Sequence, residues 1–457
     1  MSPFHAASIG AAKARRQRLS TLLGDTPALI PAGAPCSRNF PSNVYSFRAS
    51  SHFLYLIGHA LPGAYALLEG ERTRLFVQPP AEDDALWHGA VPSFAELAAQ
   101  LGCELVALDQ LKAALAKLDA SSLLAPDHAT QARQRELLGR APDASTSERD
   151  ARLAQAILSL RLVHDAAAID ELRLAGEGTV AAHIAGMHVT RPGIGEAAIC
   201  AAMEMELRRR DMGTSYESIV TVHGEVLHNV SHAGVARAGD ILLADVGAET
   251  PRGWAGDVTR CWPVSGTFEG GQRDAYQVVL NAQAAALAIA KPGTRYRDVH
   301  LAAARATTQG LLDLGVLTGD VDELVADGVH ALLFPHGVGH LLGLDVHDME
   351  DLGDRAGYAE GRARSEQFGL SYLRLDRDLE PGMAVTIEPG LYVVPAILED
   401  ETLRRVEAGR LNRAALDALN VRGIRIEDDI LITETGHQVL TAGAPKSVAE
   451  VEATVGG

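Results

Sequence analysis

The sequence predicts an α+β protein of two domains: a smaller α/β domain over residues 1–150 and a larger domain over residues 151–457 that contains a repeated αβ unit. Residues 19–141 alternate short apolar segments, bounded by Gly or Pro, with helical patterns, as is typical of an α/β domain. The polar stretch 141–150 interrupts this alternation. Beyond it, the order helix, basic-Pro-Gly, helix, strands occurs twice.

The first domain is expected to contain four strands and two helices. Apolar runs predict the strands at 28–30, 53–57, 64–68 and 75–77, and helical spacing of apolar residues predicts the helices at 96–101 and 110–118. No cluster of potential metal ligands accompanies these segments, so the chemistry is expected in the second domain.

The second domain is predicted to begin with a helix that Asp165 can cap and that ends at Arg191-Pro192-Gly193, followed by a helix over about 196–210. A helix through 276–287 ends at Lys291-Pro292-Gly293 and is followed by a helix over about 297–314. Because Pro-Gly after a helix is common, this punctuation alone leaves coincidence as an alternative to duplication. A duplicated unit would supply ligands from both halves to one central site.

Composition excludes several functional classes. The formal charge of −18 and the pI near 5.4 disfavour binding to nucleic acids or anionic membranes. No run of about 18 apolar residues is present, and residues 1–7 lack the basic start of a secretion signal. The four cysteines are scattered, with no Cys-x-x-Cys pair. We therefore expect a cytoplasmic protein.

Five potential metal ligands lie at the ends of apolar or glycine-punctuated segments of the second domain: Asp245, Asp257, His340, Glu388 and Glu427. Each alone has an ordinary explanation, such as a turn residue, a core histidine or part of a solvated acidic run. Together they form a hard, oxygen-rich set that suits two Mn²⁺-like ions, for which Co²⁺ or Zn²⁺ can substitute, better than structural zinc. Burying four carboxylates together also requires cations, so the sequence predicts a two-metal hydrolase.

The segments around these residues resemble the pita-bread metallopeptidases, in particular the aminopeptidase P and prolidase branch. The matching segments are Asp245-Val-Gly, Gly256-Asp257-Val-Thr-Arg, His336-Gly-Val-Gly-His340, Thr386-Ile-Glu388-Pro-Gly and Arg425-Ile-Glu427. Residues 51–58 and 62–68 are similar to the creatinase-type domain that precedes the catalytic domain in that branch. Asp245 and Asp257 are one residue further apart than is usual in the family, and we expect the turn 250–253 to absorb the extra residue without turning either side chain to the other face.

The resemblance implies a role for each site residue. Asp257 and Glu427 would bridge two ions, Asp245 would bind one, and His340 and Glu388 would complete the shell of the other. Glu388 would also shuttle a proton, and further residues would contact the substrate or orient the carboxylates: His228, His336, His347, Arg374 and Arg425. The implied substrates are peptides with proline at the second position, and the implied assembly is a homodimer.

Two rivals use the same scaffold, namely metal-free creatine amidinohydrolases and non-catalytic binding modules, and the complete ligand set argues against both. Chain-length preference is a separate question. Arg374, in the insertion 348–378, matches the arginine with which prolidases bind the free carboxylate of a dipeptide, and a guanidinium can hold a carboxylate bidentately. The alternative is an ordinary surface arginine, and residues 423–436 look more like aminopeptidase P. The sequence therefore favours an Xaa-Pro dipeptidase over an Xaa-Pro aminopeptidase by a small margin.

Overall fold

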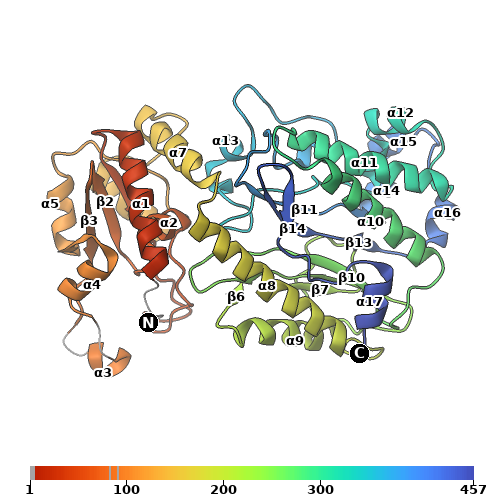
Figure 1. The fold of residues 1–457 in the computed structure, drawn as a ribbon, viewed down its shortest axis with the longest axis horizontal. Helices are drawn as coiled ribbons and strands as arrows, with labels where there is room; N and C mark the ends of the chain where they lie inside the picture. The colour runs from red at the N-terminus through yellow and green to blue at the C-terminus, as the bar shows by residue number, and fades with distance from the viewer. Residues whose placement is uncertain (1–5, 82–83, 90–91, 457) are drawn as a thin grey trace. The chain divides into compact units, whose positions relative to one another are not determined.

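The computed structural model describes residues 6–81, 84–89 and 92–456 and divides into two compact units, Met1–Ala167 and Ala168–Gly457 (Figure 1). The first five residues, on which the prediction about a secretion signal partly rests, lie outside the described residues. The first unit extends beyond the polar stretch 141–150 because helix α7 (Glu148–Arg161) contacts it closely: Tyr55 Oη donates a hydrogen bond of 2.7 Å to the Leu160 carbonyl. In the described part of the chain, no helix is both long and apolar enough to span a membrane.

The first unit is a five-stranded mixed sheet in the order β4-β3-β2-β1-β5, with helices around it. Its β2 pairs antiparallel with β1 and β3, whereas β5 and β4 join the sheet in parallel. Leu29, Leu67 and Phe76 form its core with Leu111 and Leu115. The strands are β1 (Ala28–Pro31), β2 (Tyr65–Glu69), β3 (Arg72–Val77), β4 (Glu104–Ala107) and β5 (Ser121–Ser122), and the other helices are α1 (Ala6–Leu23), α2 (Ser51–Ile57), α3 (Asp84–His88), α4 (Phe94–Leu101), α5 (Leu111–Leu115) and α6 (His128–Leu138).

Helix α2 corrects one prediction, because residues 53–57 were expected to form a strand. All seven residues of α2 are buried, so the segment has no polar face whose spacing could distinguish a helix from a strand. The helix ends at Gly58, whose φ of 75° is a left-handed conformation that glycine adopts readily. The helix predicted over 110–118 is also shorter and covers only α5.

The second unit repeats one arrangement, in which two long helices are followed by a three-stranded antiparallel sheet. In each of the two sheets, the strand that is second in chain order lies between the other two. In the first half, α8 and α9 precede the sheet β10-β8-β7, and in the second, α10 and α11, which lie side by side, precede the sheet β11-β14-β15 (Figure 1). The helices are α8 (Ala166–Val189), α9 (Glu196–Arg208), α10 (Gly271–Ile289) and α11 (Tyr296–Asp313), and the strands are β7 (Ile219–Thr221), β8 (Ile241–Asp245), β10 (Thr259–Pro263), β11 (Ala384–Ile387), β14 (Asp428–Ile432) and β15 (His437–Val439).

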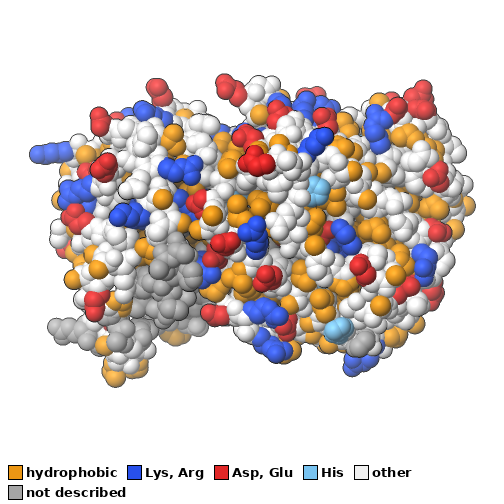
Figure 2. Space-filling model, viewed as in Figure 1, with side chains coloured by type: hydrophobic (Ala, Val, Ile, Leu, Met, Phe, Trp, Pro, Cys, Tyr) orange, Lys and Arg blue, Asp and Glu red, His pale blue; other side chains and the backbone are white. Residues whose placement is uncertain are grey.

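Shorter elements connect these parts. Two-stranded sheets are formed by β6 (Gly213–Thr214) with β9 (Ala248–Glu249) and by β12 (Gly390–Tyr392) with β13 (Gly423–Arg425). The remaining helices are α12 (Val321–Ala326), α13 (Asp354–Gly357), α14 (Pro395–Glu399), α15 (Glu401–Glu407), α16 (Arg413–Ala418) and α17 (Val448–Thr454). On the face of this unit shown in Figure 2, basic and acidic side chains are interspersed.

The Pro-Gly punctuation recurs with the same backbone geometry in both halves. Gly193 has φ of 89° and Gly293 has φ of 81°, a conformation that favours glycine. Two residues after each of these glycines, the chain forms an isolated β-bridge: Gly195 pairs with Val235 in the first half, and Arg295 pairs with Asp378 in the second. This shared geometry, with the shared meander, favours duplication over coincidence.

Candidate metal centre

Asp245 and Asp257 come from one hairpin of the first half. Asp245 ends β8 and pairs with Thr259, and Asp257 lies two residues before that partner. The chain turns at the predicted place, where Gly253 N donates to Thr250 O at 2.8 Å. The hydroxyl oxygen of Tyr216 lies 2.5 Å from Oδ1 of Asp245 and 2.5 Å from Oδ1 of Asp257, so the longer spacing leaves the two aspartates on the same side.

His340 and Glu388 are positioned by neighbouring segments of the second half. His340 N donates to Thr386 Oγ1 at 3.1 Å, and Thr386 N donates to the His340 carbonyl at 3.1 Å. Glu388 follows β11 directly, and its amide donates to Val338 O at 2.8 Å. The histidine segment therefore lies alongside the end of β11, which brings both side chains to the same place.

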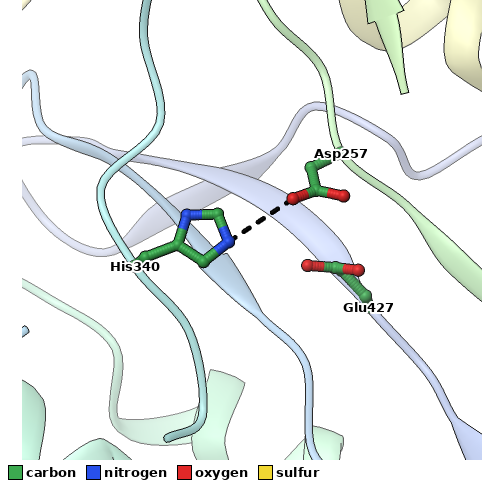
Figure 3. A group of neighbouring side chains, drawn as sticks. All are labelled: Asp257, His340 and Glu427. Carbon is green, nitrogen blue, oxygen red and sulfur yellow. Dashed lines mark ion pairs between the residues drawn. The ribbon is translucent and has the colours of Figure 1, made fainter. Parts of the chain in front are cut away.

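Three side chains from separate segments converge on one point (Figure 3). Asp257, His340 and Glu427 are buried, and each offers a ligand atom within 4.8 Å of the others. His340 Nε2 lies 3.4 Å from Asp257 Oδ2 and 3.6 Å from Glu388 Oε1. Such a group of carboxylate oxygens and an imidazole nitrogen has the chemistry of a site for a divalent cation.

The carboxylates of the centre repel one another in a buried environment. Burial and the charges of Asp257 and Glu388 raise the pKa of Glu427 well above its usual value, and burial raises the pKa of Glu388 to about 7 despite the opposing effect of His340. The pKa of Asp245 is also raised by burial. Although burial alone would lower it, the pKa of His340 is raised by Asp257 and Glu388. An excess of buried negative charge is what a bound cation would neutralise.

Arg425 is almost completely buried and connects the centre to its support. Its Nη2 lies 2.5 Å from Asp245 Oδ2, its Nε donates to Thr259 Oγ1 at 2.8 Å, and its Nη1 donates to Tyr392 Oη at 2.9 Å. Thr259 Oγ1 in turn donates to Glu427 Oε2 at 2.7 Å. This network connects carboxylates of both halves, and the orienting role of Arg425 stays a prediction.

The three consecutive acids at 427–429 do not form a solvated run, because all three are buried. Glu427 lines the centre, whereas Asp428 forms ion pairs with Arg260 at 2.7 Å and with Lys446 at 2.6 Å. Asp429 accepts a hydrogen bond of 3.0 Å from the amide of Asp257. The two neighbours of Glu427 thus support the segments that carry the candidate ligands.

All ten predicted site residues line a single cavity of about 470 Å³, a volume within the usual range for small-ligand sites. Besides Arg364 and two glycines, the rest of its wall consists of apolar side chains: Leu227, Pro335, Phe368, Tyr372, Val394 and Ile397. The ten residues that the cavity brings together are His228, Asp245, Asp257, His336, His340, His347, Arg374, Glu388, Arg425 and Glu427.

The histidines of the cavity that are not candidate ligands favour the neutral form. Burial lowers the pKa of His228 and His347 and lowers that of His336 to about 3. His336 lies 2.9 Å from Tyr392 Oη and 2.8 Å from the carbonyl of Gly337. The ring centroid of His347 lies 4.2 Å from that of His340.

Several functional contacts escaped the sequence analysis. Tyr216, Thr259, Tyr392 and Glu350 all contact predicted site residues through hydrogen bonds. Tyr216 lies 29 residues before Asp245 in a polar segment, and nothing in its surroundings distinguishes it from a surface tyrosine. Only the fold, which places the hydroxyl of Tyr216 beside both aspartates of the hairpin, reveals the contact.

The fold and the centre define a metallopeptidase: the chain belongs to metallopeptidase family M24, whose model matches residues 170–434. Residues 12–124 match the model of the aminopeptidase P N-terminal domain. Among individual proteins, the chain is similar to a Xaa-Pro aminopeptidase of Escherichia coli (38% identical over 64% of this chain and 59% of that protein) and to Xaa-Pro aminopeptidase 2 of Streptomyces coelicolor (33% identical over 96% and 89%). It is also similar to a human Xaa-Pro dipeptidase, at 29% identity over 97% of this chain and 92% of that protein.

Solved structures agree with the assignment of the fold. The Pseudomonas aeruginosa aminopeptidase PepP superposes with a TM-score of 0.80 at 29% identity, covering 97% of this chain and 98% of that one. The Asp260Ala variant of Escherichia coli aminopeptidase P gives a TM-score of 0.80 at 30% identity, over 98% of both chains. Together these findings confirm the predicted pita-bread fold with its preceding N-terminal domain.

Proposed function

We propose that this protein is a two-metal peptidase that cleaves the bond between an N-terminal residue and a following proline. The convergence of four carboxylates and His340 in one cavity carries the proposal, because three of the four carboxylates have raised pKa values that a cation would relieve. The residues present therefore fit a pair of divalent ions, and the oxygen-rich donor set favours Mn²⁺. The residues that would hold the ions are Asp245, Asp257, His340, Glu388 and Glu427.

Bound divalent ions would lower the pKa of a water molecule and polarise the scissile carbonyl. Glu388 lines the cavity with its Oε1 3.6 Å from His340 Nε2, so its carboxylate would be placed to take a proton from that water molecule and pass it to the leaving nitrogen of proline. His228 is the candidate hydrogen-bond donor to the carbonyl oxygen, and the apolar wall formed by Val394 and Ile397 suits the proline ring or the side chain before it.

With regard to the length of the substrate peptide, we propose an Xaa-Pro aminopeptidase as the main candidate, whereas the sequence alone favoured an Xaa-Pro dipeptidase by a small margin. Arg374, the residue expected to hold the carboxylate of a dipeptide, already has a carboxylate partner: its Nη1 lies 2.9 and 2.8 Å from the two oxygens of Glu350. The dipeptidase remains the second candidate because Arg374 lines the cavity.

The test compares hydrolysis of Ala-Pro with that of Ala-Pro-Ala and longer peptides before and after removal of metal with a chelator. We expect Ala-Pro-Ala to be cleaved efficiently, activity to be lost on chelation, and Mn²⁺ to restore it. Activity that survives complete removal of metal would reject the two-metal mechanism. A strong preference for Ala-Pro that collapses in Arg374→Ala would establish the dipeptidase. The predicted homodimer is tested by the molecular mass in solution.

A further inference from the structure

Residues 348–378 form part of the wall between two cavities. Arg364 and Arg374 line the main cavity described above, and both also line a smaller cavity of about 140 Å³. Glu350 lines the smaller cavity, but it is not among the described residues that line the main cavity. Glu350 therefore contacts Arg374 from the smaller cavity.

The contacts of Glu350 tie it to two residues of the main cavity at once. Both of its carboxylate oxygens accept hydrogen bonds from Arg374 Nη1, and its Oε2 also accepts from His347 Nδ1 at 3.3 Å. The second contact gives the carboxylate of Glu350 a partner besides Arg374. Although burial alone would raise it, the pKa of Glu350 is lowered to about 2 by His347 and Arg374, so the carboxylate is charged at neutral pH.

A substrate carboxylate that approaches Arg374 therefore meets a guanidinium whose positive charge is already offset by the carboxylate of Glu350. Side-chain exposure of 40% for Arg374 and 42% for Glu350 keeps their pairing moderate in strength. This ion pair nevertheless affects substrates selectively, because it weakens the binding only of those ligands that interact with the guanidinium of Arg374. A dipeptide Xaa-Pro presents its free carboxylate directly after proline, whereas a longer peptide continues there with a neutral amide.

We propose that Glu350 is a specificity-determining residue that acts through Arg374, and that its carboxylate disfavours dipeptides by offsetting the positive charge of the guanidinium that would bind their C-terminal carboxylate. The proposal rests on the proposed Xaa-Pro peptidase function and deepens it by assigning the substrate class, peptides longer than two residues, to a particular ion pair.

The test measures kcat and KM for Ala-Pro and for Ala-Pro-Ala in the wild type, Glu350→Gln, Arg374→Ala and the double variant. Glutamine keeps an oxygen that can accept from His347 Nδ1 and removes only the charge. The matched control is Glu360→Gln, which removes one negative charge from an exposed position of the same segment.

In Glu350→Gln we expect the ratio of kcat/KM for Ala-Pro to that for Ala-Pro-Ala to rise about two- to fivefold, the range of a partly exposed ion pair. The gain should appear as a lower KM for Ala-Pro, should vanish in the double variant, and should be absent in the control. General damage to the site cannot produce it, since damage lowers turnover of both substrates.

An unchanged ratio would overturn the proposal. A lower ratio would also overturn it, because Glu350 would then orient Arg374 toward the substrate carboxylate. A gain that persists in the double variant would show that Arg374 is not the residue involved. If the wild type cleaves neither peptide, the proposed function itself fails, which is a separate outcome.

Discussion

Removing the metal should make the stability of the second unit depend on pH in a direction set by Glu388. The pKa of this carboxyl rises from 4.5 to about 7 on folding because of burial, and its side chain is only 16% exposed. A raised folded-state pKa means that the native state binds the proton more tightly than the unfolded state. The resulting stabilisation is therefore complete below pH 4.5 and is lost as pH rises through about 7.

The difference between the two pKa values corresponds to about 3 kcal/mol, at 1.36 kcal/mol per pH unit, most of it lost between pH 5 and pH 8. The assay is urea unfolding of the chelator-treated protein at several pH values, with Glu388→Gln as the reference that cannot titrate. The free energy of unfolding should fall more steeply with pH in the wild type than in this variant.

Adding saturating Mn²⁺ should reverse the trend, because the cation competes with protons for the same oxygens and binds more tightly at higher pH. Equal pH slopes in the metal-free wild type and Glu388→Gln would refute the argument that this carboxyl holds a proton in the folded state.

Three further predictions concern the support of the centre. Tyr216→Phe removes the hydroxyl that lies beside both Asp245 and Asp257. It should weaken metal binding by about 10- to 100-fold, which is the usual effect of removing a hydrogen-bond partner of a metal ligand. Calorimetric titration of the metal-free protein measures the affinity, and an unchanged value would contradict the prediction. Asp257→Ala should lower both metal content and rate, and two ions per chain in that variant would break its assignment as a bridging ligand. Gly247→Ala would place a Cβ in contact with the Gly256 carbonyl and should reduce the free energy of unfolding by about 1–3 kcal/mol or more, which urea unfolding measures.

Much of the site could be predicted because each candidate ligand lies in a short segment with its own signal. A carboxylate at the end of an apolar strand, such as Asp245 after residues 241–244, has an ordinary explanation by itself, but burying it together with three others is costly, so the set is informative. The two Pro-Gly turns also stand out, because glycine at positive φ after a helix has a clear sequence pattern.

The residues that were missed act through contacts distant in sequence. Glu350 bonds to Arg374 across 24 positions, and Tyr216 bonds to Asp257 across 41. The strand predicted over 53–57 failed for a different reason, since a fully buried helix shows no periodicity. The contact between Glu350 and Arg374 could not be predicted from the motif around Arg374, and that motif alone favoured the dipeptidase.

The ion pairs of Asp428 have a consequence for the order in which this protein can mature during its synthesis. The candidate ligands extend from Asp245 to Glu427, and the segment that carries the last of them is held by partners that lie later still, Thr441 and Lys446. A growing chain that has just exposed Glu427 would have all five ligands but would leave Asp428 without two of its partners. Because domains form as units once their contacts are available, metal loading should follow the emergence of residues 441–446 from the ribosome.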